Sequence, residues 1–239
     1  MDIDVLVVSA VEDEGHKLLP FMTEKSDLNV KKYMHYTMGD IGDHSVAAML
    51  GGVGAFSIAA TTALAIRDLK PKCAIFMGVA SGIQTDSLAF GDVVIVDKVF
   101  SDESLSPQRD HNYWENPLNN KRLPPFYYAD PKLLKLAESL SKDFAKEFGI
   151  SVHIGTGTSS DYFPFPPWFE EHYRERDTLT IDLESAPFAS VCWLFDIPFI
   201  IVRGISNIVD KDSHFEFTED SITAPSKAAA QFTAKLILG

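Results

Sequence analysis

Strand-like runs recur along this chain of 239 residues, and most of them are continuously apolar rather than alternating. A continuous run of aliphatic and β-branched residues is typical of a strand that is covered on both faces. Seven runs fit this description, at residues 5–8, 44–50, 73–77, 93–99, 151–155, 179–181 and 199–202. They predict a central sheet that is largely buried.

Segments with the apolar spacing of helices lie between these runs, at residues 56–69, 131–148, 185–195 and 225–238. In the second of them, Leu133, Leu140 and Phe144 share one stripe, and Gly149 suits a C-cap. No repeat or linker divides the chain. The alternation predicts an α/β three-layer sandwich with a mixed central β-sheet, formed by one domain over residues 1–239.

The net charge of −13 argues against nucleic acid and an anionic membrane as partners, but not against a small neutral ligand. Cys73 and Cys192 lie in apolar runs, which predicts buried free thiols rather than disulfides. The N-terminus is acidic, and no apolar run approaches the ~18 residues of a membrane span. We therefore expect a cytoplasmic protein.

In α/β sheets, ligands bind beyond the carboxyl ends of strands, so polar residues that follow the runs are site candidates. Glu12, Asp13 and Glu14 follow the first run. The helix dipole accounts for Glu12 and Asp13, whereas Glu14 is a candidate base. The turn 51–54 is rich in glycine and allows close approach of a ligand, but it lacks the ending of a P-loop and the full dinucleotide fingerprint.

The densest polar group follows the last two strand-like runs: Asp182, Glu184, Arg203 and Asn207. Two acids, an arginine and an amide at strand ends exceed what a core needs, which indicates a site. The competing interpretation is a structural ion pair between Glu184 and Arg203.

A possible metal site comes next in the chain, at Asp210, Asp212 and His214. Their spacing matches no established ligand motif, so we expect neither a metal nor a cofactor.

Taken in order, these motifs resemble the nucleoside phosphorylase superfamily, and within it the 5′-methylthioadenosine/S-adenosylhomocysteine nucleosidase branch. The matching segments cover nearly the whole chain and comprise residues 9–14, 51–54, 78–82, 90–92, 160–163, 182–184, 202–207 and 213–217.

The resemblance implies cleavage of a nucleoside's N-glycosidic bond through a transition state like a ribosyl cation. Glu14 would be the general base that activates water, Arg203 would position both, and Asn207 stands where the leaving base is activated. The residues implied for substrate binding are Glu184 at the ribose hydroxyls, Leu183 where methionine is usual, Asp182, Phe163 on the base, Pro164, Val79, Val53 and Phe217.

The nucleophile is predicted to be water. Phosphorylases of the superfamily hold phosphate with an arginine and a serine, at the positions where Phe76 and Val79 stand here. A phosphate dianion would be poorly solvated beside these apolar groups, which favours hydrolysis over the alternative of a nucleoside phosphorylase. The hydrolase branch itself tends to have serine in place of Val79.

Two residues depart from the branch on the side of the base. The branch has an aspartate at Asn207 that protonates the departing adenine, whereas an amide can only form hydrogen bonds. The residue after Phe163 normally offers its N–H to adenine, and Pro164 has none. These changes support an alternative substrate, a 6-oxopurine nucleoside of the futalosine or inosine type. A further alternative is a non-catalytic nucleoside-binding homologue.

The resemblance also implies a homodimer in which the neighbouring subunit closes the pocket. The aromatic stretch of residues 113–128 is the predicted interface, because aromatic residues are enriched in protein interfaces.

Overall fold

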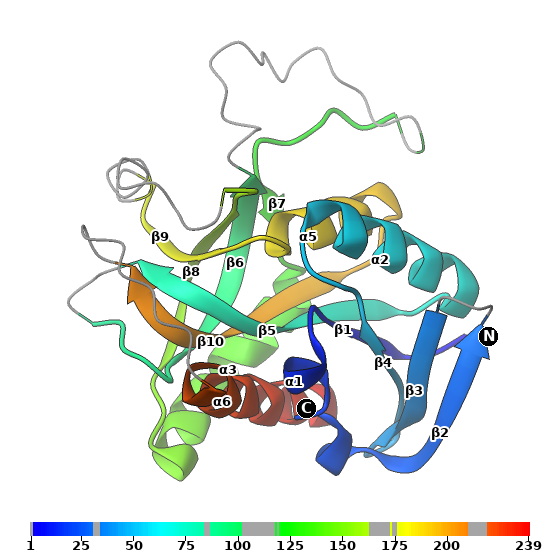
Figure 1. The fold of residues 1–239 in the computed structure, drawn as a ribbon, viewed down its shortest axis with the longest axis horizontal. Coiled ribbons are helices and arrows are strands. Elements are labelled where there is room, and N and C mark those ends of the chain that lie inside the picture. The colour runs from blue at the N-terminus through cyan, green and yellow to red at the C-terminus, as the bar shows by residue number, and fades with distance from the viewer. Residues whose placement is uncertain are drawn as a thin grey trace.

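A mixed sheet with helices on both faces forms the body of the protein, as the computed structural model shows (Figure 1). The structure describes residues 2–30, 34–83, 87–101, 118, 120–162, 173, 176–209 and 219–239. Within these residues the sheet has ten strands: β1 (Val5–Ser9), β2 (Thr23–Val30), β3 (Met34–Ile41), β4 (His44–Leu50), β5 (Cys73–Ile83), β6 (Val93–Ser101), β7 (Tyr127–Tyr128), β8 (Val152–Ser159), β9 (Thr178–Asp182) and β10 (Phe199–Val209).

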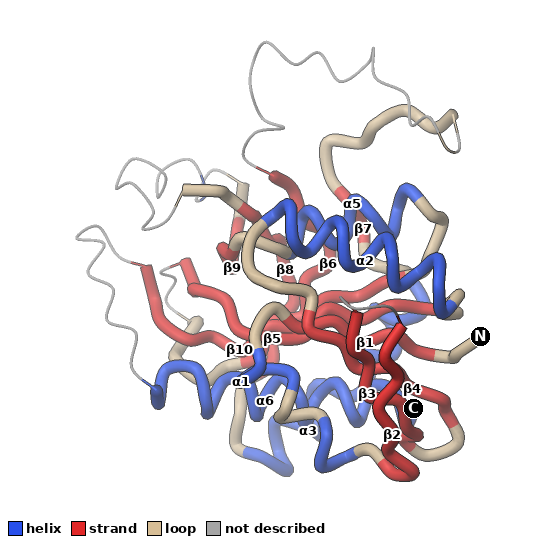
Figure 2. Tube along the Cα trace, turned by 45° about the vertical axis from the view of Figure 1, so that its right-hand side comes forward, coloured by secondary structure: helices blue, strands red, loops and turns tan. Residues whose placement is uncertain are grey.

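Helices cover the two faces of this sheet. Their bounds are α1 (Glu12–Gly15), α2 (Ala55–Leu69), α3 (Pro131–Phe148), α5 (Ser185–Leu194) and α6 (Glu219–Leu238), with a short 3₁₀ turn η1 (Leu19–Phe21). Figures 1 and 2 show α2 and α5 together on one face, and α1, α3 and α6 on the other. In the described part of the chain, no helix is both long and apolar enough to span a membrane.

The central strands are parallel and buried, as their continuous apolar sequences predict. β1 pairs in parallel with β4 and β5, and β5 pairs in parallel with β10. Leu6 and Val8 of β1 belong to the core under α2 and α5, whereas Val5 and Val7 belong to the core under α3 and α6. Successive residues of one strand therefore fill two different cores.

At one end, the sheet closes on itself. The order β10-β6-β8-β9-β5 is completed by the pairing of β10 with β5, so five strands form a ring. In β10 the register shifts between Ile205 and Asn207, and such a bulge bends a strand. The expected mixed sheet with helices is confirmed. The flat three-layer arrangement is not confirmed, because the ring replaces the open sheet at this end.

All seven strand-like runs and all four helical segments are present. The helix predicted over residues 131–148 has these bounds, with Asp130 accepting N–H bonds from Lys132 and Leu133, and Gly149 in the left-handed region at φ 68°. α6 extends from Glu219, so Pro225 lies inside it. The prediction missed β2, β3 and the two-residue β7, because none of these contains a continuous apolar run.

Candidate active site

The residues predicted to act together come from three neighbouring strands of the sheet. Glu14 lies in α1, directly after β1, and Arg203 lies in β10. Between them runs β5, in which Gly78 is the register partner of Arg203. The parallel order β1-β5-β10 thus brings these two side chains to one edge of the sheet.

The carboxylate of Glu14 is buried and held by backbone donors. One oxygen, Oε2, accepts hydrogen bonds from the N–H groups of Ala10 at 2.9 Å and Val11 at 3.2 Å. The other, Oε1, accepts one from Val79 at 2.7 Å. Burial raises the pKa of Glu14, although Arg203 and these donors act in the opposite direction. Only 3% of the residue is exposed, so its carboxylate is oriented before any ligand binds.

Arg203 is fully buried and restrained on several sides. Its Nη2 lies 2.7 Å from an oxygen of Asp182, and its Nε donates to the Ser185 hydroxyl at 3.1 Å. Its guanidinium carbon lies 3.9 Å from the centre of the Phe76 ring. A β-carbon at Gly78 would be 2.8 Å from Nη1 of Arg203 and would also run into the Glu14 carboxylate. Glycine is therefore needed where Glu14 and Arg203 approach each other.

Asp182 uses both carboxylate oxygens inside the protein. Oδ1 accepts from the Ser159 hydroxyl at 2.7 Å and from the N–H groups of Glu184 at 3.1 Å and Ser185 at 2.9 Å. Oδ2 receives the Ser185 hydroxyl and the cation of Arg203. The side chain thus fixes the start of α5 and the position of Arg203.

Glu184 is nearly buried and connects two helix starts. Its Oε1 accepts a hydrogen bond from the N–H of Gly54 at 2.8 Å, which joins the glycine-rich turn before α2 to the turn before α5. Burial, assisted by the charge of Asp182, raises the pKa of Glu184 to about 7. Among the described residues, Arg203 forms its ion pair with Asp182 and not with Glu184. The structural ion pair between Glu184 and Arg203 is therefore wrong.

Asn207 lies further along β10, opposite Ser81 of β5. Its Oδ1 lies 3.0 Å from the Ser81 hydroxyl and 2.8 Å from the Ser206 hydroxyl, and both donate to it. Its Nδ2 makes no hydrogen bond to any residue that the structure describes. Since the oxygen is occupied, the amide offers its N–H groups to a ligand. The sequence analysis missed both serines, although they lie in the motifs at residues 78–82 and 202–207.

The remaining predicted residues have mixed outcomes. Leu183 and Val79 are partly buried beside the groups described above, and Val53 is 58% exposed. Phe163, Pro164 and Phe217 lie outside the described residues, as do Asp210, Asp212 and His214. No group of three potential metal ligands occurs among the described residues.

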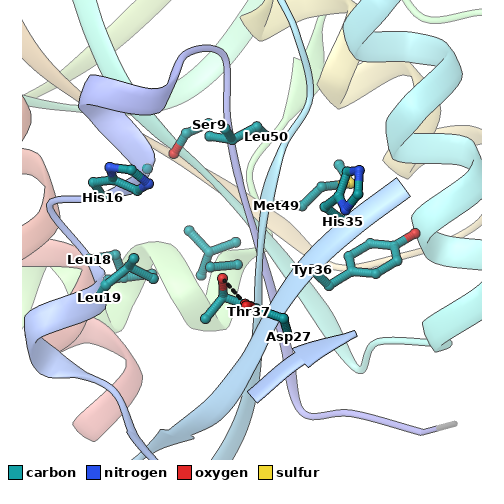
Figure 3. A pocket seen from close by; sticks show the side chains of 13 residues that line it. Ser9, His16, Leu18, Leu19, Asp27, His35, Tyr36, Thr37, Met49 and Leu50 are labelled. Atoms are coloured by element: carbon teal, nitrogen blue, oxygen red, sulfur yellow. Dashed lines mark hydrogen bonds between the residues drawn. The ribbon is translucent and has the colours of Figure 1, made fainter. Parts of the chain in front are cut away.

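A separate cavity of about 410 Å³ adjoins the other side of α1 (Figure 3). It lies between the α1–η1 segment and strands β3 and β4. Its lining consists of Val7, Ser9, Gly15, His16, Leu18, Leu19, Asp27, His35, Tyr36, Thr37, Ala48, Met49 and Leu50. The sequence analysis gave no indication of it, because these residues come from five elements and form no motif.

Glu184→Gln is expected to stabilise the protein at pH 8 but not at pH 5. The folded state holds a proton on Glu184 up to about pH 7, whereas a free glutamate has a pKa of 4.5, so the free energy of unfolding falls as pH rises through this window. Glutamine removes that cost, a gain of ~2–3 kcal/mol at pH 8. Urea unfolding at both pH values measures it. A difference that does not change with pH, or an equal gain in the exposed control Glu138→Gln, would contradict the expectation.

Solved structures with this fold are nucleosidases. The crystal structure of 5′-methylthioadenosine/S-adenosylhomocysteine nucleosidase from Neisseria meningitidis, in complex with methylthio-immucillin-A, aligns with a TM-score of 0.81 at 22% identity, over 98% of both chains. A putative nucleosidase of the same name from Borrelia burgdorferi, bound to adenine, aligns with a TM-score of 0.82 at 24% identity, over 98% of this chain and 99% of the other. The fold is therefore that of nucleosidases and nucleoside phosphorylases.

The chain belongs to the phosphorylase superfamily, whose sequence profile matches residues 4–238. Among curated relatives, the nucleosidase of Listeria welshimeri is 29% identical over 89% of this chain and 90% of its own length. That of Oceanobacillus iheyensis is 29% identical over 97% of both chains. Both relatives are 5′-methylthioadenosine/S-adenosylhomocysteine nucleosidases.

Proposed function

We propose that this protein hydrolyses the N-glycosidic bond of a purine nucleoside of the 5′-methylthioadenosine or S-adenosylhomocysteine type. The names of its relatives support this substrate class. The single observation that carries the proposal is the arrangement at Gly78, where a buried carboxylate on three backbone donors lies next to a buried arginine. No cofactor takes part.

In the proposed reaction, Glu14 takes a proton from a water molecule as the oxygen attacks the anomeric carbon of the ribose. The bond from this carbon to the base nitrogen breaks, and its electron pair leaves with the base, which then gains a proton. Glu184 accepts hydrogen bonds from the ribose hydroxyls. Buried carboxylates near the electron-poor sugar stabilise its developing positive charge, and they act strongly because the site excludes water. The products are a free base and a free sugar.

Water is the proposed nucleophile because the protein leaves no donor set for phosphate. Phe76 is fully buried, and its ring lies against Arg203. The guanidinium already pairs with Asp182, so little of its charge is free to bind a dianion.

Base release in a buffer without phosphate tests the proposal. Chromatography should detect the free base and a free 5′-substituted ribose in equal amounts. Added phosphate should neither raise the rate nor yield a sugar phosphate. A requirement for phosphate would show that the enzyme is a phosphorylase, and binding without turnover would show a non-catalytic homologue.

We further propose that residues 1–239 form one domain and that it acts as a cytoplasmic homodimer. Cys73 and Cys192 are free thiols, as is usual in a reducing compartment, although Cys73 is only partly buried. The dimer proposal rests on an apolar surface at the start of α2, where Val53 is 58% exposed and Phe56 is 88% exposed. This surface flanks Gly54, the residue that binds Glu184, so a partner placed there would cover the ribose side of the site.

Phe56→Glu is expected to convert the dimer to monomers and to lower kcat/KM at least ~10-fold, because two glutamates would face each other across a desolvated interface. Light scattering after gel filtration and a rate assay on the same samples measure both effects. Phe90→Glu is the matched control, since Phe90 is also exposed but lies at the start of β6. Dissociation caused by Tyr128→Glu instead would place the interface at the aromatic stretch.

A further inference from the structure

Phe76 is a fully buried aromatic residue in the middle of β5, and it lies against the guanidinium of Arg203. In the core under α2 and α5, its ring also stacks on Phe188, with centroids 5.0 Å apart and planes at 23°. A purely structural phenylalanine needs only apolar neighbours. Phe76 instead has a buried cation 3.9 Å from its ring centre, which is the geometry of a cation–π contact.

The other contacts of Arg203 restrain its edges but not its plane. Asp182 binds Nη2 and Ser185 binds Nε, so rotation within the plane is fixed. Nη1 has no hydrogen-bond partner among the described residues, and it lies at Gly78 beside the Glu14 carboxylate. The tilt of the guanidinium, which determines how Nη1 faces Glu14, is restrained by the ring of Phe76.

We propose that Phe76 is a positioning residue, whose ring holds the guanidinium of Arg203 in the plane that directs Nη1 toward Glu14. This rests on the proposed role of Glu14 as general base. Arg203 favours the ionised form of Glu14, which burial disfavours. If the ring is lost, Arg203 is held less firmly, and Glu14 retains its proton to a higher pH.

The charged groups around Glu14 come from several elements. Buried ones are Arg203 on β10, Asp182 at the end of β9 and Glu184 before α5. Exposed ones on α1 and on α6, which packs against α1, are Glu12, Asp13, His16, Asp220 and Lys227. Solvent screens the exposed groups, so Arg203 is the cation that acts on Glu14.

Phe76→Leu is expected to lower kcat about 10-fold with little change in KM, and to move the acid limb of the pH profile of kcat/KM upward by about half a unit. Phe188→Leu is the matched control, because it removes an equally buried ring from the same stack, whereas the guanidinium lies on Phe76. Both variants should lose melting temperature, but only Phe76→Leu should shift the limb. Phe76→Met keeps more side-chain volume and serves if Phe76→Leu does not fold.

Two results would overturn the proposal: an unshifted acid limb in Phe76→Leu and Phe76→Met, or an equal shift in Phe188→Leu. The proposed function is tested separately, by base release from the wild type and by loss of the limb in Glu14→Gln. If those tests succeed and the limb of Phe76→Leu does not move, only the positioning role of Phe76 fails.

Discussion

Replacing Glu14 with glutamine is expected to lower kcat by a factor of ~10²–10⁴, the usual contribution of a general base. Glutamine has nearly the same shape but cannot take a proton from water. The three backbone donors around Glu14 require two acceptor oxygens, and glutamine supplies one. We therefore also expect a loss of ~1–3 kcal/mol in the free energy of unfolding, from a donor left without an acceptor.

Rates must accordingly be measured on folded protein, with melting curves recorded at the assay temperature. Glu12→Gln is the control, since it makes the same change two residues earlier in α1, at an exposed side chain that contacts only His16 at 3.5 Å. Glu12→Gln should retain full activity. If folded Glu14→Gln protein turned over substrate at the wild-type rate, Glu14 would not be the base.

Asn207→Asp is expected to raise kcat for adenine nucleosides about 100-fold, because a carboxylic acid can protonate the departing base whereas an amide cannot. One oxygen of the new carboxyl would retain the hydroxyls of Ser81 and Ser206. The other would replace Nδ2, the atom that the described residues leave without a partner. The pH profile should gain a basic limb, because the new acid acts only while protonated.

The substrate series for this experiment pairs 5′-methylthioadenosine with inosine, in the wild type and in two variants. Asn207→Ala, the control, should lose activity toward both nucleosides. A wild-type enzyme that prefers inosine would assign Asn207 to 6-oxopurines, whose ring nitrogen and oxygen both accept hydrogen bonds. If Asn207→Asp changed neither rate, Asn207 would not contact the base.

Buried strands could be predicted from sequence because burial on both faces leaves a continuous apolar record. The hairpin of β2 and β3 could not, since β2 has the polar sequence TEKSDLNV and lies at the edge of the sheet. The ring was equally hidden, because it depends on pairings between distant strands. No local pattern records that β5 pairs with both β9 and β10.

At the candidate site, position along the chain revealed which polar residues belong together, but not how they pair. Glu14, Glu184 and Arg203 follow strands, and their proximity could be expected from topology. That Asp182 rather than Glu184 holds the arginine depends on side-chain directions around one tight turn. Ser81 and Phe56 carry no signal of their own, because a serine near glycines and a phenylalanine in a helix are common.

Closure of the ring also governs which backbone groups remain open to other chains. A strand at the edge of a sheet can template the addition of a foreign strand, which is a route to aggregation. β5, β10, β8 and β9 each have neighbours on both sides, so the strands that carry the site offer no such edge. Among the described strands, the long open edge is β2, where Lys25 and Asp27 are exposed and discourage the approach of another chain.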